Sequence, residues 1–372
     1  MARNYRGPIV DCDLHHIWKT PNDVLQYLPK EWQEYANGVA PRGARNGTAG
    51  SNFPEGNRRH DSFRVEGEPP CSDYEFTREQ LFDRHNFWRI VAAFDVGGHG
   101  NQQNPYFGTA YARAVNDWNA DTWLTYDERI YGVVGINMAQ PDEAAAEFRR
   151  VGQHPRVCAT VLAGSPLGRP YGDPIYDPIW KAAAEMGLPV DIHFGTAAPE
   201  RQAGGIPESD LASIVPMWAT MMHHVTSLIV NGVFEKWPTM RVLIKEVGTM
   251  WLPQLMWRLD ESYESLKRES QWVKKLPSEY MREHIKLGTQ PLEEVPNADD
   301  LKSFFEVNEM DDILCFASDY AHTTFDDPDN IARRLPDGWA RRVMCDNSCE
   351  HYGWTPPVPD PALEPEHAGA AA

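Results

Sequence analysis

The stretch IVDCDLHH at residues 9–16 begins with apolar residues and ends in side chains that bind metal ions. Three later stretches share this layout: LPVDIH at 188–193, RVLIKE at 241–246 and ILCFASD at 313–319. Each is typical of a short strand with a residue that can bind a metal ion or transfer a proton at its carboxyl end. In a closed barrel of parallel strands these ends meet on one face, where such barrels place their active sites. The sequence therefore predicts one pocket. Its residues are Asp13, His15, His193, Glu246 and Asp319.

Helix and strand signals alternate along the rest of the chain, which favours parallel strands joined by crossover helices. Further strands are expected near residues 89–94, 130–137, 157–162 and 285–287. The clearest helices are expected at residues 109–125, 177–186, 209–231 and 251–273. The predicted fold class is therefore α/β, and the architecture is a distorted (β/α)8 TIM barrel with a long insertion after its first strand.

Residues 1–355 are expected to form a single barrel domain, since such barrels often exceed 250 residues. Residues 17–75 carry many turn-forming residues and make a longer connection than compact domains usually need. This insertion either covers the pocket as a lid or is a surface excursion without a role. The tail at 356–372 is rich in Pro, Ala and Glu, a composition typical of disorder.

The chain is acidic, because 35 Lys and Arg residues stand against 54 Asp and Glu residues, for a formal net charge of −19. Nucleic acids and anionic membranes attract basic surfaces, so neither is expected as a partner. The 6 cysteines form no CxxC pair, and no apolar run suggests a signal peptide or a membrane span. We therefore expect a cytoplasmic protein with reduced thiols that acts on a small molecule.

Asp13 and His15 are separated by one residue, so both side chains point to the same face of a strand. This spacing lets the pair bind one ion, although many such triplets bind nothing. With His193 and Asp319 the set holds two imidazoles and two carboxylates, which fits a catalytic divalent-metal site with an open position. For His193 alone, a hydrogen-bonded core histidine is the alternative. By strand alternation, His16 is expected to point away from His15 and to pack outside the barrel.

Other side chains near these strand ends have more than one interpretation. Glu246 can be a general base, a partner that hydrogen-bonds to a metal ligand, an additional ligand, or the ion-pair partner of Arg258 in the next helix. His322 either contacts substrate or orients Asp319, or it is an ordinary loop histidine. Trp251 is a candidate wall for an aromatic substrate, with Arg258 as a further substrate-binding candidate; packing of the helix on the barrel is the alternative. The catalytic candidates are Asp319, Glu246 and His322.

Several segments, in order along the chain, carry a family resemblance. They are DCDLHH at 11–16, YARAVNDW at 111–118, YDPIW at 176–180, GLPVDIH at 187–193, GVFEKWP at 232–238 and SDYAH at 318–322. Together they resemble the amidohydrolase-2 family, the branch of the amidohydrolase superfamily that includes aminocarboxymuconate-semialdehyde decarboxylase. The resemblance implies an enzyme, either a metal-dependent hydrolase or a carboxy-lyase. Related barrels often pair through helices and long loops, so it also implies a homodimer as one assembly.

By this resemblance, the metal ligands of the family correspond to Asp13, His15, His193 and Asp319. Two positions depart from the most frequent pattern. The first ligand is often His, whereas the decarboxylase branch commonly has a carboxylate there, as at Asp13. The sixth strand of decarboxylases often ends in a His that acts as acid or base, whereas this strand ends in Glu246.

Asp and His ligands suit Zn²⁺, and the carboxylates also tolerate Mn²⁺, so we expect one divalent ion with zinc favoured over manganese. Two reactions of a small cyclic or aromatic carboxylic acid then fit. In hydrolysis of an amide or lactone, metal-bound water attacks the carbonyl while Asp319 or Glu246 takes the proton. In non-oxidative decarboxylation, an acid protonates the carbon that loses CO2. A third alternative is a non-catalytic barrel that binds metal or ligand, which Glu246 favours and the retained ligand set opposes.

Overall fold

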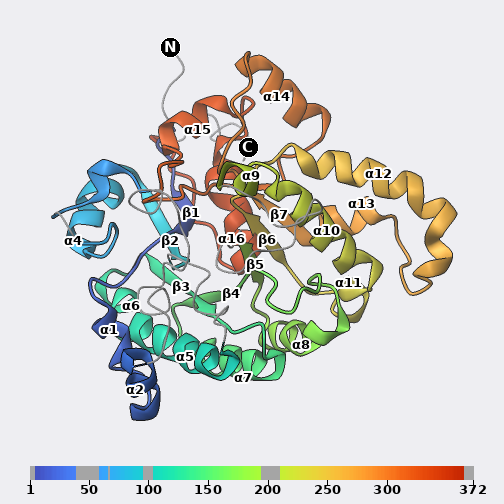
Figure 1. Cartoon of the computed structure of the whole chain (residues 1–372). Helices are drawn as coiled ribbons and strands as arrows, with labels where there is room; N and C mark the ends of the chain where they lie inside the picture. The colour runs from blue at the N-terminus through green and yellow to red at the C-terminus, as the bar shows by residue number, and fades with distance from the viewer. Residues whose placement is uncertain (1–4, 39–57, 66–67, 95–103, 194–209, 364–372) are drawn as a thin grey trace.

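The structure is a computed structural model that describes residues 5–38, 58–65, 68–94, 104–193 and 210–363. Eight parallel strands pair in sequence order and form the centre of the molecule, with helices around them (Figure 1). The strands are β1 (Ile9–Leu14), β2 (Phe87–Ala92), β3 (Ile130–Gly135), β4 (Val157–Ala163), β5 (Val190–His193), β6 (Val242–Lys245), β7 (Ile285–Gly288) and β8 (Leu314–Cys315). This arrangement confirms the predicted (β/α)8 barrel.

Backbone bonds between β1 and the segment after β8 close the barrel. The amide of Asp319 donates to the carbonyl oxygen of Asp13 at 3.1 Å. The fully buried carboxylate of Asp11 accepts the backbone N–H and the hydroxyl of Ser318, at 2.9 and 2.6 Å. Burial raises the pKa of Asp11 to about 7, against the effect of these hydrogen bonds. The closure places the ends of the first and last strands side by side.

The longer helices lie in the crossovers between strands. They are α5 (Pro105–Asp121), α7 (Pro141–Val151), α8 (Asp177–Met186), α10 (Met217–Val230), α12 (Trp251–Leu266) and α14 (Ala298–Val307). Shorter α-helices are α1 (Pro21–Leu25), α2 (Lys30–Gly38), α4 (Tyr74–Thr77), α6 (Trp123–Tyr126), α9 (Asp210–Ile214), α11 (Val233–Lys236), α13 (Pro277–His284), α15 (Pro328–Arg334) and α16 (Asn347–Tyr352). Single 3-10 or π turns lie at His60–Ser62, Arg78–Phe82, Pro174–Tyr176, Lys267–Glu269 and Arg342–Asp346.

Side-chain caps explain where several helices begin. The side chain of Asn104 accepts the backbone N–H groups of Tyr106 and Phe107, and Pro105 occupies the first turn of α5. Asp327 caps α15 in the same way, by accepting the backbone N–H of Asn330. Such caps satisfy N–H groups that have no partner within the helix.

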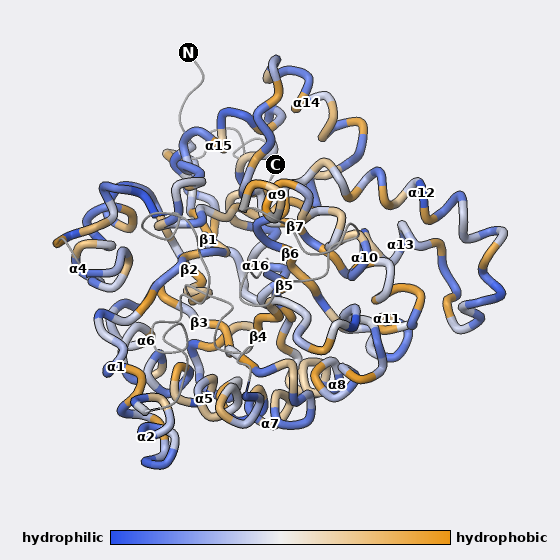
Figure 2. The backbone as a smooth tube through the Cα atoms, in the orientation of Figure 1, coloured by the Kyte–Doolittle hydropathy of each residue, from blue (hydrophilic) through white to orange (hydrophobic). Residues whose placement is uncertain are grey.

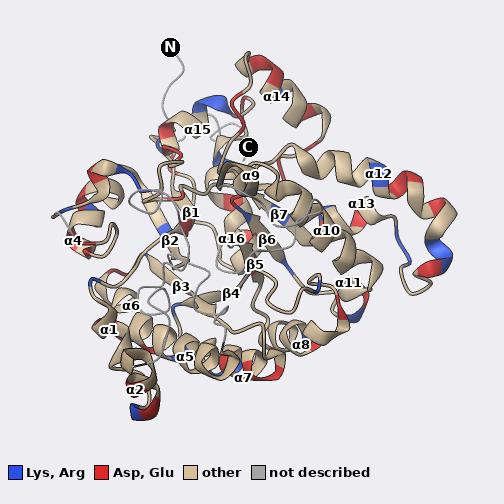
Figure 3. Ribbon diagram, viewed as in Figure 1, with Lys and Arg blue, Asp and Glu red and all other residues tan. Residues whose placement is uncertain are grey.

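Apolar side chains fill the barrel and the space beneath the helices. All six residues of β1 are buried, as are all four of β5 and of β6. Figure 2 shows hydrophobic stretches along the strands, and Figure 3 shows charged residues mainly on outer helices such as α7, α12 and α14. All 6 cysteines are buried and carry free thiols. Within the described ranges, no helix is long and apolar enough to span a membrane.

Several elements differ from their expected bounds. The helix expected at 209–231 is divided into α9 and α10, and Pro216, which has no N–H, stands at the start of α10. The helix expected at 251–273 ends at Leu266 and a short 3-10 turn. The last strand is only Leu314–Cys315, since its pairing with β7 extends over these two residues alone.

The expected insertion at 17–75 contains α1, α2 and α4 in its described parts, whereas 39–57 and 66–67 lie outside the described residues. Of the tail expected to be disordered, 364–372 also lie outside them. The lid and the single domain over 1–355 stay predictions.

Gly172, in the loop between β4 and α8, is a position where the backbones approach too closely for a side chain. A Cβ atom there would lie 2.1 Å from the carbonyl oxygen of Ser227 in α10. We expect Gly172→Ala to lower the free energy of unfolding by about 1–3 kcal/mol, measured by urea titration, because backbone must move to admit the methyl group. Gly38→Ala, whose Cβ would meet nothing within 4 Å, is the control. Equal stability of the two variants would contradict this packing.

Candidate metal centre

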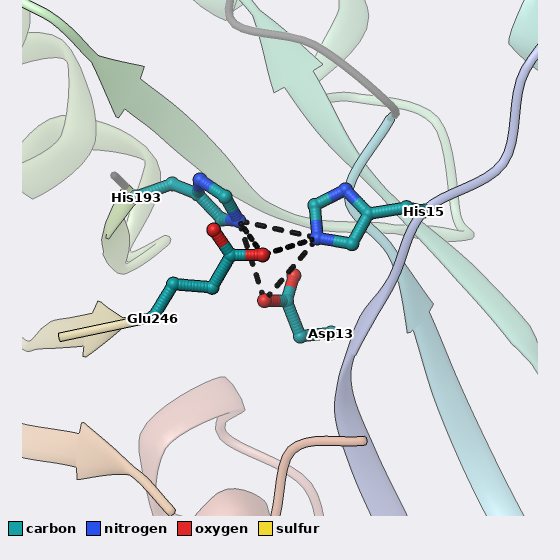
Figure 4. Close-up of side chains that lie close together, drawn as sticks. All are labelled: Asp13, His15, His193 and Glu246. Carbon is teal, nitrogen blue, oxygen red and sulfur yellow. Dashed lines mark hydrogen bonds and ion pairs between the residues drawn. The ribbon is translucent and has the colours of Figure 1, made fainter. Parts of the chain in front are cut away.

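Six side chains from four segments meet at the carboxyl ends of the strands. They are Asp13, His15, His193, Glu246, Asp319 and His322. Asp13 belongs to β1 and His193 ends β5. His15 and Glu246 directly follow β1 and β6, and Asp319 and His322 lie in the segment after β8. Figure 4 shows the first four pointing toward one another. The predicted convergence of distant strand ends is therefore observed.

His15 lies at the centre of this cluster. Its Nε2 atom is 3.0 Å from Glu246 Oε1, 3.3 Å from Asp319 Oδ1 and 3.3 Å from His193 Nε2. Asp13 Oδ2 lies 3.3 Å from His193 Nε2 and 3.6 Å from His15 Nε2. Two overlapping groups of four residues can each hold an ion: Asp13, His15, His193 and Glu246, and His15, Glu246, Asp319 and His322. Within each group, one ligand atom from each residue lies within 4.8 Å of the ligand atoms of the other three.

The backbone turns sharply where two of these carboxylates leave their strands. Glu246 and Asp319 both have φ of 57°, in the left-handed region that residues other than glycine seldom adopt. Such conformations cost free energy and are concentrated at functional sites. The strain is therefore consistent with selection for the direction of these two side chains.

Neighbouring groups fix the orientation of the central residues. His15 Nδ1 lies 2.9 Å from the carbonyl oxygen of Phe94, so this nitrogen donates and Nε2 faces the cluster. Asp319 Oδ2 accepts hydrogen bonds from Gln290 Nε2 at 2.8 Å and from Thr324 Oγ1 at 2.6 Å. Its other oxygen, Oδ1, is in contact with Nδ1 of His322.

The cluster carries a strong negative field. Burial opposes protonation of His15, but Asp13 and Glu246 outweigh burial and raise the pKa of His15 to about 9. Burial and the nearby Glu246 carboxylate raise the pKa of Asp319 well above its ordinary value. Glu246 shows the opposite shift, because His193 and His15 outweigh its burial and lower its pKa. The field thus favours positive charge at the centre, whether a proton or a metal cation.

The donor set fits a divalent metal ion. Both carboxylate oxygens of Asp13 and Oε1 of Glu246 are buried, yet none takes part in a hydrogen bond within the described part of the chain. Buried carboxylate oxygens normally have such partners, so these atoms are suited to a cation. Two imidazole nitrogens complete a mixed N and O set that suits zinc or manganese.

The two substrate-binding candidates on α12 are not among the six residues of the cluster. Arg258 has an exposed side chain and pairs with Glu261 at 2.8 Å, one turn further along the helix. It does not pair with Glu246, and nothing in this placement supports a role at the pocket. Trp251 is buried, and its indole N–H donates to the carbonyl oxygen of Gly248 at 3.0 Å. Packing of helix on barrel therefore accounts for Trp251.

His16 lies outside the barrel, as strand alternation predicts. It is fully buried, and its Nε2 is 2.9 Å from Asn119 Oδ1 of α5. Its ring stacks on those of Phe94 and Trp118. This is the packing of a structural histidine.

Sequence reasoning missed several residues at or beneath the site. They are Arg58, Asp191, Lys245, Gln290 and Thr324. Asp191 and Lys245 had a signal, because a charged residue inside an apolar strand is rarely buried without a partner. The other three lie in connecting segments, where the sequence gives no sign of what they contact.

A family profile described as amidohydrolase matches residues 10–354 of the chain. The chain belongs to the amidohydrolase family. This confirms the resemblance seen in the sequence and the expectation of an enzyme. The gamma-resorcylate decarboxylase of Rhodococcus jostii (strain RHA1) is 27% identical over 202 residues. That match covers 50% of this chain and 60% of the relative.

Solved structures of other amidohydrolases share the fold. An amidohydrolase from Mycobacterium avium subsp. paratuberculosis K-10 has a TM-score of 0.71 and 20% identity, with 95% of this chain and 99% of that chain covered. A dihydroxybenzoic acid decarboxylase from Polaromonas sp. JS666, solved with manganese and the inhibitor 2-nitroresorcinol, has a TM-score of 0.67 and 16% identity, with 93% and 97% covered. Likenesses at this level of identity support the barrel architecture.

Proposed function

We propose that this amidohydrolase is a metal-dependent decarboxylase of a small hydroxylated aromatic carboxylic acid. The observation that carries the proposal is the contact between Asp319 and His322 beside a cluster suited to a cation. The contact between the Asp319 carboxylate and the His322 imidazole gives this pair a hydrogen bond along which a proton can move. The named activities of the Rhodococcus and Polaromonas relatives support the same class of reaction.

The proposed metal ligands are Asp13, His15, His193 and Asp319, around one divalent ion. When bound, such an ion supplies positive charge that stabilises negative charge on the oxygens of the substrate. The Polaromonas structure holds manganese, so the comparisons give no support to a preference for zinc. Because the donor set is rich in carboxylates, we propose that manganese serves at least as well as zinc.

The Asp319–His322 pair supplies the proton in this proposal. The proton moves to the ring carbon that bears the carboxylate, the bond from that carbon to the carboxylate breaks, and its electron pair restores the aromatic ring. CO2 leaves, and the pair regains a proton from water. Gln290 and Thr324 hold Asp319 Oδ2, so that Oδ1 stays directed at His322.

Glu246 is proposed to act as an ionised carboxylate. Its Oε1 lies 3.4 Å from His322 Nδ1 and 3.0 Å from His15 Nε2. Since its pKa is lowered, Glu246 stays ionised and does not donate a proton at neutral pH. It therefore stabilises the protonated form of His322 before the transfer.

Arg58 is the proposed partner of the substrate's negative charge. Its backbone forms an antiparallel bridge with that of His322, and Arg59 N donates to the carbonyl oxygen of Ala321 at 3.0 Å. Residues opposite each other in such a bridge point to the same side, so the Arg58 side chain lies on the side of His322. It is 8% exposed, and a guanidinium binds carboxylates and phenolates through paired hydrogen bonds. The 17–75 segment would then contribute directly to the pocket.

Hydrolysis of an amide or lactone is the second candidate, favoured by one observation. Glu246 replaces the strand-end histidine expected of a decarboxylase, and a carboxylate at this position can accept a proton from water. Family membership and the intact cluster oppose the alternative of a barrel that only binds metal or ligand. The cytoplasmic location and the homodimer stay predictions.

The proposal is tested with the full chain loaded with Mn²⁺ and, separately, with Zn²⁺. Substrates are 2,6-dihydroxybenzoate, 5-carboxyvanillate, an aryl lactone and an anilide, with CO2 and products measured together. We expect the amount of CO2 released to equal the amount of hydroxybenzoate consumed. In D2O, the aromatic product should carry one deuterium at the ring carbon that lost the carboxylate. Ring or amide opening without CO2 would establish hydrolysis instead. Bound metal without turnover on any substrate would favour the binding barrel.

A further inference from the structure

A fully buried lysine lies directly beneath the candidate metal centre. Lys245 ends β6, immediately before Glu246, and its side chain is 0% exposed. Its Nζ lies 2.8 Å from Asp191 Oδ2 and 3.7 Å from Asp13 Oδ1, and it also donates to the carbonyl oxygen of Cys12. A charge so deep in a barrel is costly unless the structure compensates it.

Asp191 anchors this ammonium group. It lies on β5 two residues before His193, so both side chains point to the same face of the strand. Its carboxylate also faces His351 Nε2 at 3.0 Å and accepts the hydroxyl of Tyr352 at 3.0 Å, both from α16. The positive charge of Lys245 is therefore fixed in place by a network that extends to the last helix.

The two oxygens of Asp13 face different neighbours. Oδ1 faces the ammonium of Lys245, whereas Oδ2 lies 3.3 Å from His193 Nε2 and 3.6 Å from His15 Nε2. The ammonium of Lys245 on one side and the two imidazoles on the other are thus the charged groups that orient this carboxylate. A fixed cation on one side thus decides which oxygen is presented to the pocket.

We propose that Lys245 is a positioning residue whose ammonium group, anchored by Asp191, holds Oδ1 of Asp13 and presents Oδ2 to the metal ion. The proposal rests on the metal site of the proposed function and goes beyond it, since it assigns a role to the network beneath. Asp13 would then contribute one oxygen, which preserves room for substrate. Complete burial excludes Lys245 as a nucleophile toward substrate.

The test compares two matched changes in the full chain. In the double variant Lys245→Met/Asp191→Asn, one positive and one negative charge are lost, so the net charge of the site is kept. Lys286→Met is the control, since Lys286 lies on the neighbouring strand β7 and pairs with Glu350 at 3.2 Å. Mn²⁺ affinity is measured by titration with electron paramagnetic resonance, and the spectrum of bound Mn²⁺ reports its ligand geometry.

We expect the double variant to bind Mn²⁺ about 10- to 100-fold more weakly, the range usual for residues that orient metal ligands. Its bound-Mn²⁺ spectrum should change, because Asp13 becomes able to rotate, whereas Lys286→Met should match the wild type in both measurements. Wild-type affinity and spectrum in the folded double variant would overturn the proposal. So would a loss of stability alone with metal binding unchanged.

A milder variant covers the case in which the double variant does not fold. Tyr352→Phe removes one hydrogen bond to Asp191 and keeps the ring. It should weaken Mn²⁺ binding several-fold in the same direction, and unchanged binding would overturn the proposal. Failure of this proposal can be distinguished from failure of the proposed function. A wild type that binds Mn²⁺ but releases no CO2 refutes decarboxylation only, whereas a wild type that binds no Mn²⁺ refutes both.

Discussion

Replacing Asp319 with Asn should lower kcat by about 10²- to 10⁴-fold, the usual contribution of a positioned general acid. The variant keeps the shape of the side chain but removes the carboxyl group that contacts Nδ1 of His322. The amide oxygen can still accept from Gln290 and Thr324, so the fold around it should persist. The measurement is steady-state turnover at saturating Mn²⁺, with the metal content of each sample determined alongside.

Asp312→Asn is the matched control. Asp312 lies just before β8, at the end of the strand opposite to Asp319, and it forms an exposed ion pair with Arg342. It should keep wild-type turnover. Metal content is needed because Asp319 is also a proposed ligand, and lost metal would lower turnover by another route. Wild-type kcat in fully metal-loaded Asp319→Asn would show that the proton comes from another group.

Removal of the metal ion should abolish turnover and destabilise the protein, and added Mn²⁺ should restore both. Asp13, Glu246 and Asp319 converge around the two imidazoles, so the folded site attracts a divalent cation. Binding to the folded state alone adds about 2.7 kcal/mol of stability at a free ion concentration 100 times the Kd. Turnover and the thermal unfolding midpoint are measured after chelation and after titration with Mn²⁺ or Zn²⁺.

His193→Ala and His223→Ala provide a matched pair for this experiment. His193 is buried in the cluster, whereas His223 lies exposed on α10. The first variant should lose the dependence of its unfolding midpoint on Mn²⁺, and the second should keep it. Full activity after exhaustive chelation, or identical metal responses from the two variants, would contradict the proposed site.

The pattern of strands along the chain determined much of this protein. Alternation of helices and strands predicted the barrel, and side chains at strand ends predicted the meeting of Asp13, His15, His193, Glu246 and Asp319. These predictions succeed because the carboxyl ends of all the strands in a parallel barrel lie on the same face. The alternative in which Arg258 pairs with Glu246 was wrong, since the spacing of residues along a helix does not say which face is exposed.

Long-range contacts decided the rest. Arg58 reaches His322 from a segment far earlier in the chain, and Lys245 meets Asp13 only because β6 and β1 face each other across the barrel interior. The orientation of Asp319 depends on Gln290 and on the turn that follows β8. Sequence alone determined the alternating order of strands and helices and which side chains stand near the carboxyl ends of the strands. Tertiary structure decided which side chains touch, because contact across a barrel depends on register, tilt and loop path, which local patterns do not encode.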